Sequence, residues 1–79
     1  MEIKILGPGC KNCEKLAQEV KNCLAEMNLE AAVEKVEKTD DIMEYDVFMT
    51  PGLVINQRVK ASGRVPRKEE IQQWIQEEK

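Results

Sequence analysis

The spacing of hydrophobic residues in the first third of the chain predicts a strand followed by a long helix. Ile3 and Ile5 alternate with polar residues, and Leu6 adds an apolar side chain on the other face. The first six residues are therefore predicted to form a strand covered on both sides. From residue 11 the apolar residues recur at helical spacing and form one stripe. They are Cys13, Leu16, Ala17, Val20, Leu24 and Met27. Asn28 is predicted to end this helix, because asparagine tolerates the left-handed conformation.

The middle of the chain predicts a second strand and a short helix. Residues 29–36 contain helix formers, but Val33 and Val36 follow a break, and a strand here would complete a β-α-β unit. Thr39 is predicted to cap a helix that reaches about Asp46, because threonine accepts hydrogen bonds from the free N–H groups of a first turn.

The last third predicts a β-hairpin and a closing helix. Residues 53–55 and 58–61 are rich in β-branched side chains, and Asn56 and Gln57 between them have the length of a two-residue hairpin turn. Residues 67–78 are predicted to form the final helix. Its inner face would contain Ile71, Trp74 and Ile75. The predicted order is β-α-β-α-β-β-α, in one α/β domain that spans the whole chain.

The composition excludes several classes of protein. A chain of 79 residues that is 42% hydrophobic and 34% charged can bury a core, so it is not a disordered chain. The net charge is −3 and no basic cluster occurs, so we expect no nucleic-acid partner. No apolar run approaches the ~20 residues that cross a bilayer, and residues 1–4 do not begin a secretion signal. We expect a cytoplasmic monomer without membrane contact.

The residues that can carry out chemistry are concentrated in residues 7–13, Gly-Pro-Gly-Cys-Lys-Asn-Cys. This segment connects the first predicted strand to the helix that follows it. Gly-Pro-Gly predicts a turn. The first N–H groups of a helix have no internal partner and carry partial positive charge, so a thiolate at Cys10 would be stabilised there. Cys13 lies one turn further on the same face and can close a disulfide. A lone CxxC in a reducing compartment is more often redox-active or metal-binding than structural.

These features together resemble the thioredoxin/glutaredoxin fold, and more narrowly its short archaeal and bacterial members. The resemblance is carried by residues 7–13, by Thr50-Pro51 at the start of the hairpin, and by residues 63–66 ahead of the last helix. It implies a four-stranded mixed sheet flanked by three helices. It also implies a cis peptide bond between Thr50 and Pro51, packed against a Cys10–Cys13 disulfide.

The resemblance further implies a thiol–disulfide oxidoreductase, an electron carrier that reduces or exchanges protein disulfides and serves cell redox homeostasis. Cys10 would be the nucleophile and Cys13 the resolving cysteine. The residues predicted to bind substrate are Gly9, Met49, Thr50 and Pro51. We expect no external cofactor and no metal. The expected partners are disulfide-containing proteins and an upstream reductase.

The chain departs from thioredoxins proper at several positions around the motif. Lys4 replaces a buried acid, Gly9 replaces a tryptophan, and Lys11 and Asn12 replace Gly-Pro between the cysteines. Lys11 and Asn12 are therefore predicted to tune the reactivity of the pair, since a lysine beside Cys10 favours the thiolate electrostatically.

Two other functions stay open on the sequence. The first half also resembles the heavy-metal-associated domain, in which CxxC binds Cu(I) or zinc between two thiolates, so Cys10 and Cys13 could serve a metal chaperone. The other open function is a module that only binds partner proteins and uses the fold without redox chemistry.

Other cysteine, methionine and aromatic residues are interpreted as packing residues. Cys23 lies about 15 Å from Cys13 along a helix, too far for a disulfide, and is predicted to be a small core residue at the edge of the stripe. The remaining predicted core fillers are Met27, Met43, Met49 and Trp74, with Met49 also a candidate for the substrate groove.

Overall fold

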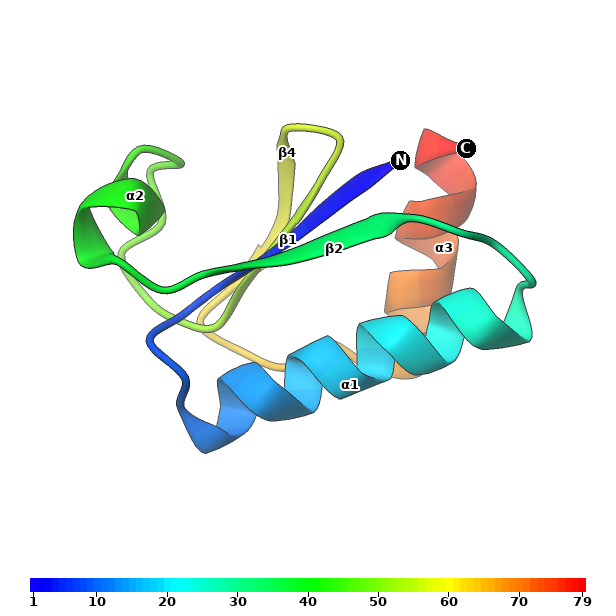
Figure 1. Ribbon diagram of the computed structural model, residues 1–79, viewed down its shortest axis with the longest axis horizontal. Coiled ribbons are helices and arrows are strands. Elements are labelled where there is room, and N and C mark those ends of the chain that lie inside the picture. Colours follow the sequence, from blue (N-terminus) through cyan, green and yellow to red (C-terminus); the bar gives the residue numbers. More distant parts are fainter.

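Four strands form one mixed sheet in the order β2-β1-β3-β4. The computed structural model describes residues 1–79 (Figure 1). Its elements are β1 (Glu2–Leu6), α1 (Lys11–Glu26), β2 (Ala32–Val36), α2 (Thr39–Met43), β3 (Gly52–Ile55), β4 (Arg58–Ser62) and α3 (Lys68–Glu78). β1 pairs with β2 in parallel and with β3 antiparallel, and β3 pairs antiparallel with β4. The predicted element order and the mixed sheet are confirmed.

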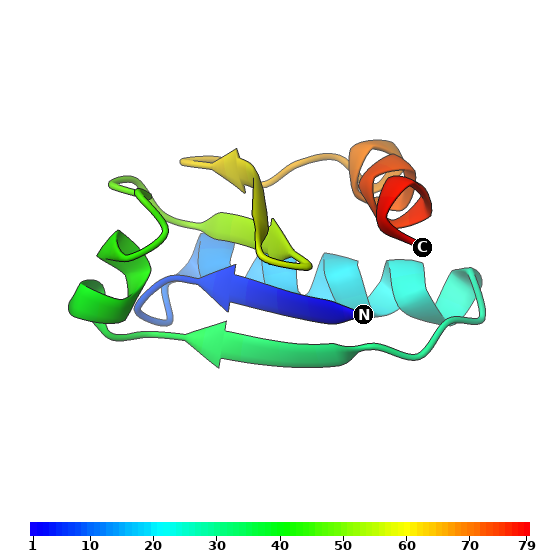
Figure 2. The same cartoon turned by 90° about the horizontal axis from the view of Figure 1, so that it is seen from above.

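One face of the sheet carries the main core. Ile3, Ile5, Leu53 and Ile55 point to this face, and α1 and α3 cover it. Figure 2 shows α1 behind the sheet and α3 beside one end of the sheet, where the C-terminus lies. From the helices the buried residues are Leu16, Ala17, Val20, Cys23, Leu24, Ile71 and Ile75. The helical spacing in the sequence therefore correctly predicted which face of each of the two helices is buried.

The other face of the sheet is only partly covered. The short helix α2 packs there over a second cluster, made of Leu6, Ile42, Val47 and Val54. Lys4, on the same face as Leu6, is half-buried beside Tyr45. The prediction that the first strand is covered on both sides therefore holds for Leu6, while Lys4 faces a polar, open part of the sheet.

The hairpin between β3 and β4 has the predicted two-residue turn. Asn56 and Gln57 both have positive φ, 49° and 70°. Two successive left-handed residues match the twist of the flanking strands. Asn56 also joins the ends of the fold, because its Oδ1 accepts from the N–H of Glu2 at 3.0 Å and its Nδ2 donates to the backbone oxygen of Glu78 at 3.1 Å. Both chain termini therefore lie at this end of the molecule (Figure 1).

Three sequence predictions are corrected by the structure. Thr39 does not cap α2: Lys38 is the extended residue before the helix, Thr39 already lies in its first turn, and no side chain caps it. Met43 and Met49 are not core fillers, with 48% and 67% of their surface exposed. Cys23 is fully buried in the main core, so the prediction of a small core residue is confirmed.

No helix is both long enough and apolar enough to cross a membrane.

The carboxylate of Glu78 fastens the end of α3 to β4. The ammonium group of Lys60 donates to it at 2.9 Å, and this hydrogen bond is the main reason that the pKa of Glu78 lies below its ordinary value near 4.5. A carboxyl group with a lowered pKa in the folded state stabilises the fold above its unfolded pKa, and this contribution is lost as the pH falls through the folded pKa.

Glu78→Gln should therefore lower the urea midpoint at pH 6 and leave the midpoint at pH 3 almost unchanged. Unfolding followed by circular dichroism at both pH values measures the difference. Glu30→Gln, at an exposed acid without an ion pair, is the control. An equal loss of stability at pH 6 and pH 3 would contradict the assignment.

Candidate active site

The loop that leaves β1 delivers two cysteines to the start of α1. Its first residue, Gly7, donates its N–H to the carbonyl oxygen of Val36 at 2.9 Å, which ties the loop to the end of β2. Gly9 has a φ of +90°, a conformation that favours glycine. Cys10 follows as the N-cap of α1, and Cys13 lies in the first turn.

Cys10 and Cys13 form a disulfide with their Cα atoms 5.0 Å apart. Cys10 is exposed, whereas only 4% of the surface of Cys13 is accessible. An incoming disulfide can therefore reach the sulfur of Cys10 while Cys13 stays underneath it. The two cysteines have the different exposures that nucleophilic attack and subsequent resolution require.

The backbone of α1 contacts the sulfur of Cys10 directly. The N–H of Cys13 donates to Cys10 Sγ at 3.1 Å. This bond uses one of the free donors at the start of the helix, where the helix dipole also places positive charge. Such a position stabilises a thiolate and lowers the pKa of a cysteine in general.

Gly7 is a residue of the site that sequence reasoning missed. A Cβ atom at this position would overlap Sγ of Cys13, and it would lie 3.7 Å from the Cβ of Thr50. Gly7 therefore allows the disulfide, the loop and the Thr50-Pro51 segment to approach one another. A glycine between a buried strand and a CxxC motif is the signal that could have identified it.

The segment before β3 forms the second wall of the site. The Thr50–Pro51 peptide bond is cis, and Pro51 is fully buried. Neither the N–H nor the C=O of Thr50 has a hydrogen-bond partner within the chain. These two backbone groups are therefore free to pair with an extended polypeptide.

Beside this segment lies an apolar cleft of about 250 Å³. Pro8 and Thr50 line it on the side of the disulfide, and α2 lines the other side with Ile42 and Met43. Phe48 stands at the cleft with 76% of its surface exposed. A large aromatic side chain in that state is available for contact with another molecule.

The comparisons with known proteins agree with this geometry. The thioredoxin domain family matches residues 1–76. The chain belongs to the thioredoxin family. It is 37% identical over 75 residues to a thioredoxin of Methanothermobacter thermautotrophicus, covering 95% of this chain and 97% of that protein. A thioredoxin of Methanocaldococcus jannaschii is 34% identical over 73 residues, covering 92% and 84%.

Membership of the thioredoxin family makes this chain a thiol–disulfide oxidoreductase. Proteins of this family act on disulfides of other proteins, are themselves reduced by a reductase, and exchange electrons through their own cysteines without an external cofactor. The predicted function class is thereby confirmed.

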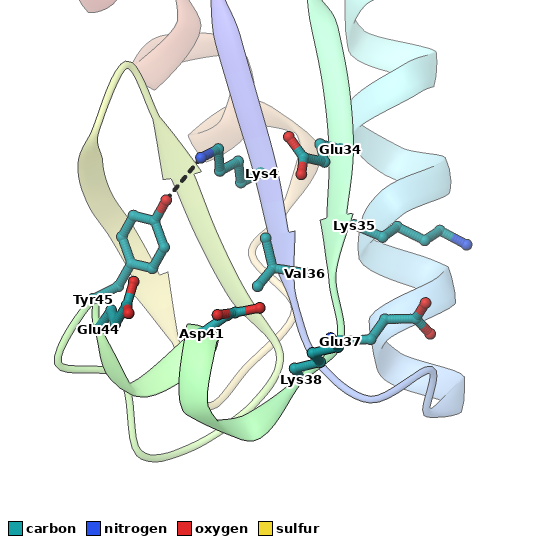
Figure 3. Close-up of a pocket in the computed structure, with 9 residues that line it drawn as sticks. All are labelled: Lys4, Glu34, Lys35, Val36, Glu37, Lys38, Asp41, Glu44 and Tyr45. Carbon is teal, nitrogen blue, oxygen red and sulfur yellow. Dashed lines mark hydrogen bonds between the residues drawn. The ribbon is translucent and has the colours of Figure 1, made fainter.

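Lys4, which replaces the buried acid of thioredoxins proper, does not face the cysteines. The ammonium group of Lys4 donates to the hydroxyl oxygen of Tyr45 at 2.9 Å, and its nitrogen lies 5.6 Å from the centre of that ring. Figure 3 shows this pair on the open face of the sheet, beside a pocket of about 400 Å³. The hydrogen bond raises the pKa of Lys4 above its ordinary value of 10.5. Lys4 therefore stays charged and is not a proton relay for the disulfide.

The two residues between the cysteines are exposed to solvent. The side chains of Lys11 and Asn12 make no hydrogen bond or ion pair within the chain. Neither side chain is therefore held against the neighbouring sulfur by a contact within the chain.

The third cysteine of this thioredoxin-family chain takes no part in the site. Cys23 is fully buried, and its thiol donates to the backbone oxygen of Lys68 across a sulfur–oxygen distance of 3.7 Å. Burial is the main cause that raises the pKa of its thiol above the ordinary value of 9.0. Both effects disfavour the reactive thiolate.

Reduced protein should therefore leave Cys23 unmodified in the native state, and all three thiols should react in denaturant. Alkylation by iodoacetamide at pH 8, followed by intact-mass measurement, gives the number directly. Cys23→Ala should leave the number of thiols modified in the native state unchanged and reduce the denatured number from three to two. Rapid modification of all three cysteines in the native protein would show that Cys23 is accessible.

Proposed function

We propose that Cys10 is the nucleophile and Cys13 the resolving cysteine in the reduction of protein disulfides. The observation that carries this proposal is the exposed Cys10 at the helix start, disulfide-bonded to the buried Cys13. The Cys10 thiolate attacks one sulfur of the substrate disulfide and expels the other as a thiolate, which takes up a proton. The thiolate of Cys13 then attacks Cys10 and expels the second substrate thiol. Two electrons pass to the substrate, and the protein is left with the Cys10–Cys13 disulfide.

The substrate would lie along the segment before β3. The free N–H and C=O of Thr50 can pair with an extended substrate backbone, as an added strand does. Gly9, which directly precedes Cys10, would contribute exposed backbone to the same surface, and Pro51 forms the buried floor of this wall. Met49 is exposed and would extend the contact surface. It lies against Gly63, because a Cβ built at Gly63 would be 3.2 Å from the Cβ of Met49.

Two charged or polar neighbours would adjust the reactivity of Cys10. Lys11 stabilises the thiolate by its charge, and Asn12 contributes a weaker dipole in the same turn. The reaction also needs a reducing compartment and an upstream reductase to return the disulfide to the dithiol. We propose the cytoplasm, where thiols are kept reduced.

Substitution of the two cysteines should separate attack from resolution. Cys10→Ser should abolish reduction of insulin disulfides, because the nucleophile is lost. Cys13→Ser should be equally inactive in turnover but should accumulate a mixed disulfide on Cys10, visible by mass spectrometry and reversed by dithiothreitol. Activity that survives Cys10→Ser, or trapping on Cys10→Ser rather than on Cys13→Ser, would overturn the assignment.

The apolar cleft should contribute to binding of protein substrates and not to the chemistry. Phe48→Ala should raise KM for insulin about threefold to tenfold, which corresponds to a loss of roughly 0.7–1.4 kcal/mol of binding free energy. The rate with bis(2-hydroxyethyl) disulfide, which is too small to fill the cleft, should not change. Val59→Ala, at another exposed apolar residue away from the cleft, is the control. Equal effects on insulin and on bis(2-hydroxyethyl) disulfide would assign Phe48 to the fold instead.

The metal-chaperone alternative loses its basis in the fold. It rested on likeness of residues 1–36 to the heavy-metal-associated domain, whose order is βαββαβ. The observed order is β-α-β-α-β-β-α, and the thioredoxin domain family covers residues 1–76.

A further inference from the structure

Glu37 lies against the loop that carries Cys10. It follows directly after β2, and its carboxylate oxygen Oε2 is 3.3 Å from the position that a Cβ at Gly9 would take. Figure 3 shows its side chain projecting from the end of β2 toward α1. The hydrogen bond from Gly7 to Val36 joins the loop to the residue before Glu37. The backbone on both sides of this contact is thus held in place.

The carboxylate of Glu37 is not neutralised by an ion pair. Lys35, two residues earlier, is engaged with both carboxylate oxygens of Glu14, at 2.9 and 2.8 Å. Lys38 and Lys11 are exposed and form no ion pair. Glu37 therefore presents an unpaired negative charge to the loop next to the reactive sulfur.

The other charged residues near the loop in the fold lie on three elements. They are Lys11 and Glu14 on α1, Lys35 and Lys38 on β2 and the segment after it, and Asp40 and Asp41 on α2. Residues 48–50, which form the opposite wall, carry no charge. Lys11 and Glu37 carry opposite charges: Lys11 follows Cys10 in sequence, and the fold brings Glu37 against Gly9, the residue before Cys10.

We propose that Glu37 is a positioning residue for the exchange reaction: its charge opposes formation of the Cys10 thiolate and keeps the cysteine couple reducing. This inference rests on the proposed role of Cys10 as nucleophile. A nearby negative charge disfavours a thiolate. In this fold, stabilisation of the reduced form makes a couple a stronger oxidant, so a charge that destabilises the thiolate makes it a stronger reductant. Glu37 thus offsets the effect of Lys11 and of the helix start.

The expected size of the effect is modest because Glu37 is exposed. A unit charge a few ångströms away in water alters such an equilibrium by about twofold to fivefold, and salt screens the effect. Removing the charge should therefore increase the thiolate fraction at acid pH by that factor.

The test is the pH profile of Cys10 alkylation in reduced Glu37→Gln. Iodoacetamide is uncharged, so its rate reports the thiolate and not attraction of the reagent. Trypsin cuts after Lys11 and places Cys10 and Cys13 in different peptides, so Cys10 can be followed alone. At pH 6 we expect a rate about twofold to fivefold above wild type, a profile displaced to lower pH, and a smaller difference in 0.5 M salt. Glu37→Lys should displace the profile further in the same direction.

Equilibration with glutathione buffers gives a second readout, in which Glu37→Gln should be a weaker reductant than wild type. Glu34→Gln, at an exposed acid on β2 that pairs with Lys4, is the control and should match wild type in both measurements. Superimposable profiles for wild type and Glu37→Gln would overturn the inference. So would a change confined to KM for insulin, which would make Glu37 a substrate contact. Either result would leave the proposed roles intact if Cys13→Ser still trapped substrate on Cys10.

Discussion

The hydrogen bond from the N–H of Cys13 to the sulfur of Cys10 is the interaction around which the site is organised. It exists because β1 ends in a glycine-rich loop and α1 begins directly after it. β1 is held in register by β2 on one side and by β3 on the other, so the position at which the chain leaves the sheet is fixed. The core residues of α1 hold the helix against the same sheet. The rest of the fold thus determines where one sulfur meets a free amide in the first turn of a helix.

The two faces of the sheet serve different purposes. The face under α1 and α3 holds the main cluster of twelve buried residues, whereas the face under α2 holds only four. A domain of this size has little interior to distribute, because small domains bury a smaller share of their surface. Lys4 and Tyr45 complete the partly covered face with a polar contact instead of further apolar packing. The concentration of apolar burial on one face keeps α1, and with it the cysteines, firmly placed.

Most of the fold could be predicted from local patterns. The alternation of Ile3 and Ile5 identifies a strand by its period of two, and the apolar stripe of α1 identifies a helix by its period. The turn is identified by residues that adopt positive φ, Asn56 and Gln57. The predictions that failed depended on long-range packing. Whether Met49 is buried depends on how the segment before Pro51 lies against Gly63, and no local pattern records that.

The cysteine motif was equally clear from the sequence, but its surroundings were not. Cys10 and Cys13 are recognisable from their spacing and the preceding turn. Gly7 and Glu37 matter because of what the sheet brings beside them: Gly7 lies under a sulfur that is six residues away, and Glu37 lies beside a loop 27 residues earlier in the chain. Thr39 was misassigned because capping depends on the backbone angle of Lys38, which composition does not specify.

The joining of both chain ends by Asn56 has a consequence for how the protein can be built into larger assemblies. The amino and carboxyl termini emerge together at the end of the sheet remote from the cysteine loop (Figure 1). A tether, a tag or a second domain attached at either terminus would therefore leave on the side away from Cys10. Large partner proteins would therefore still reach the disulfide in a fusion made at either terminus.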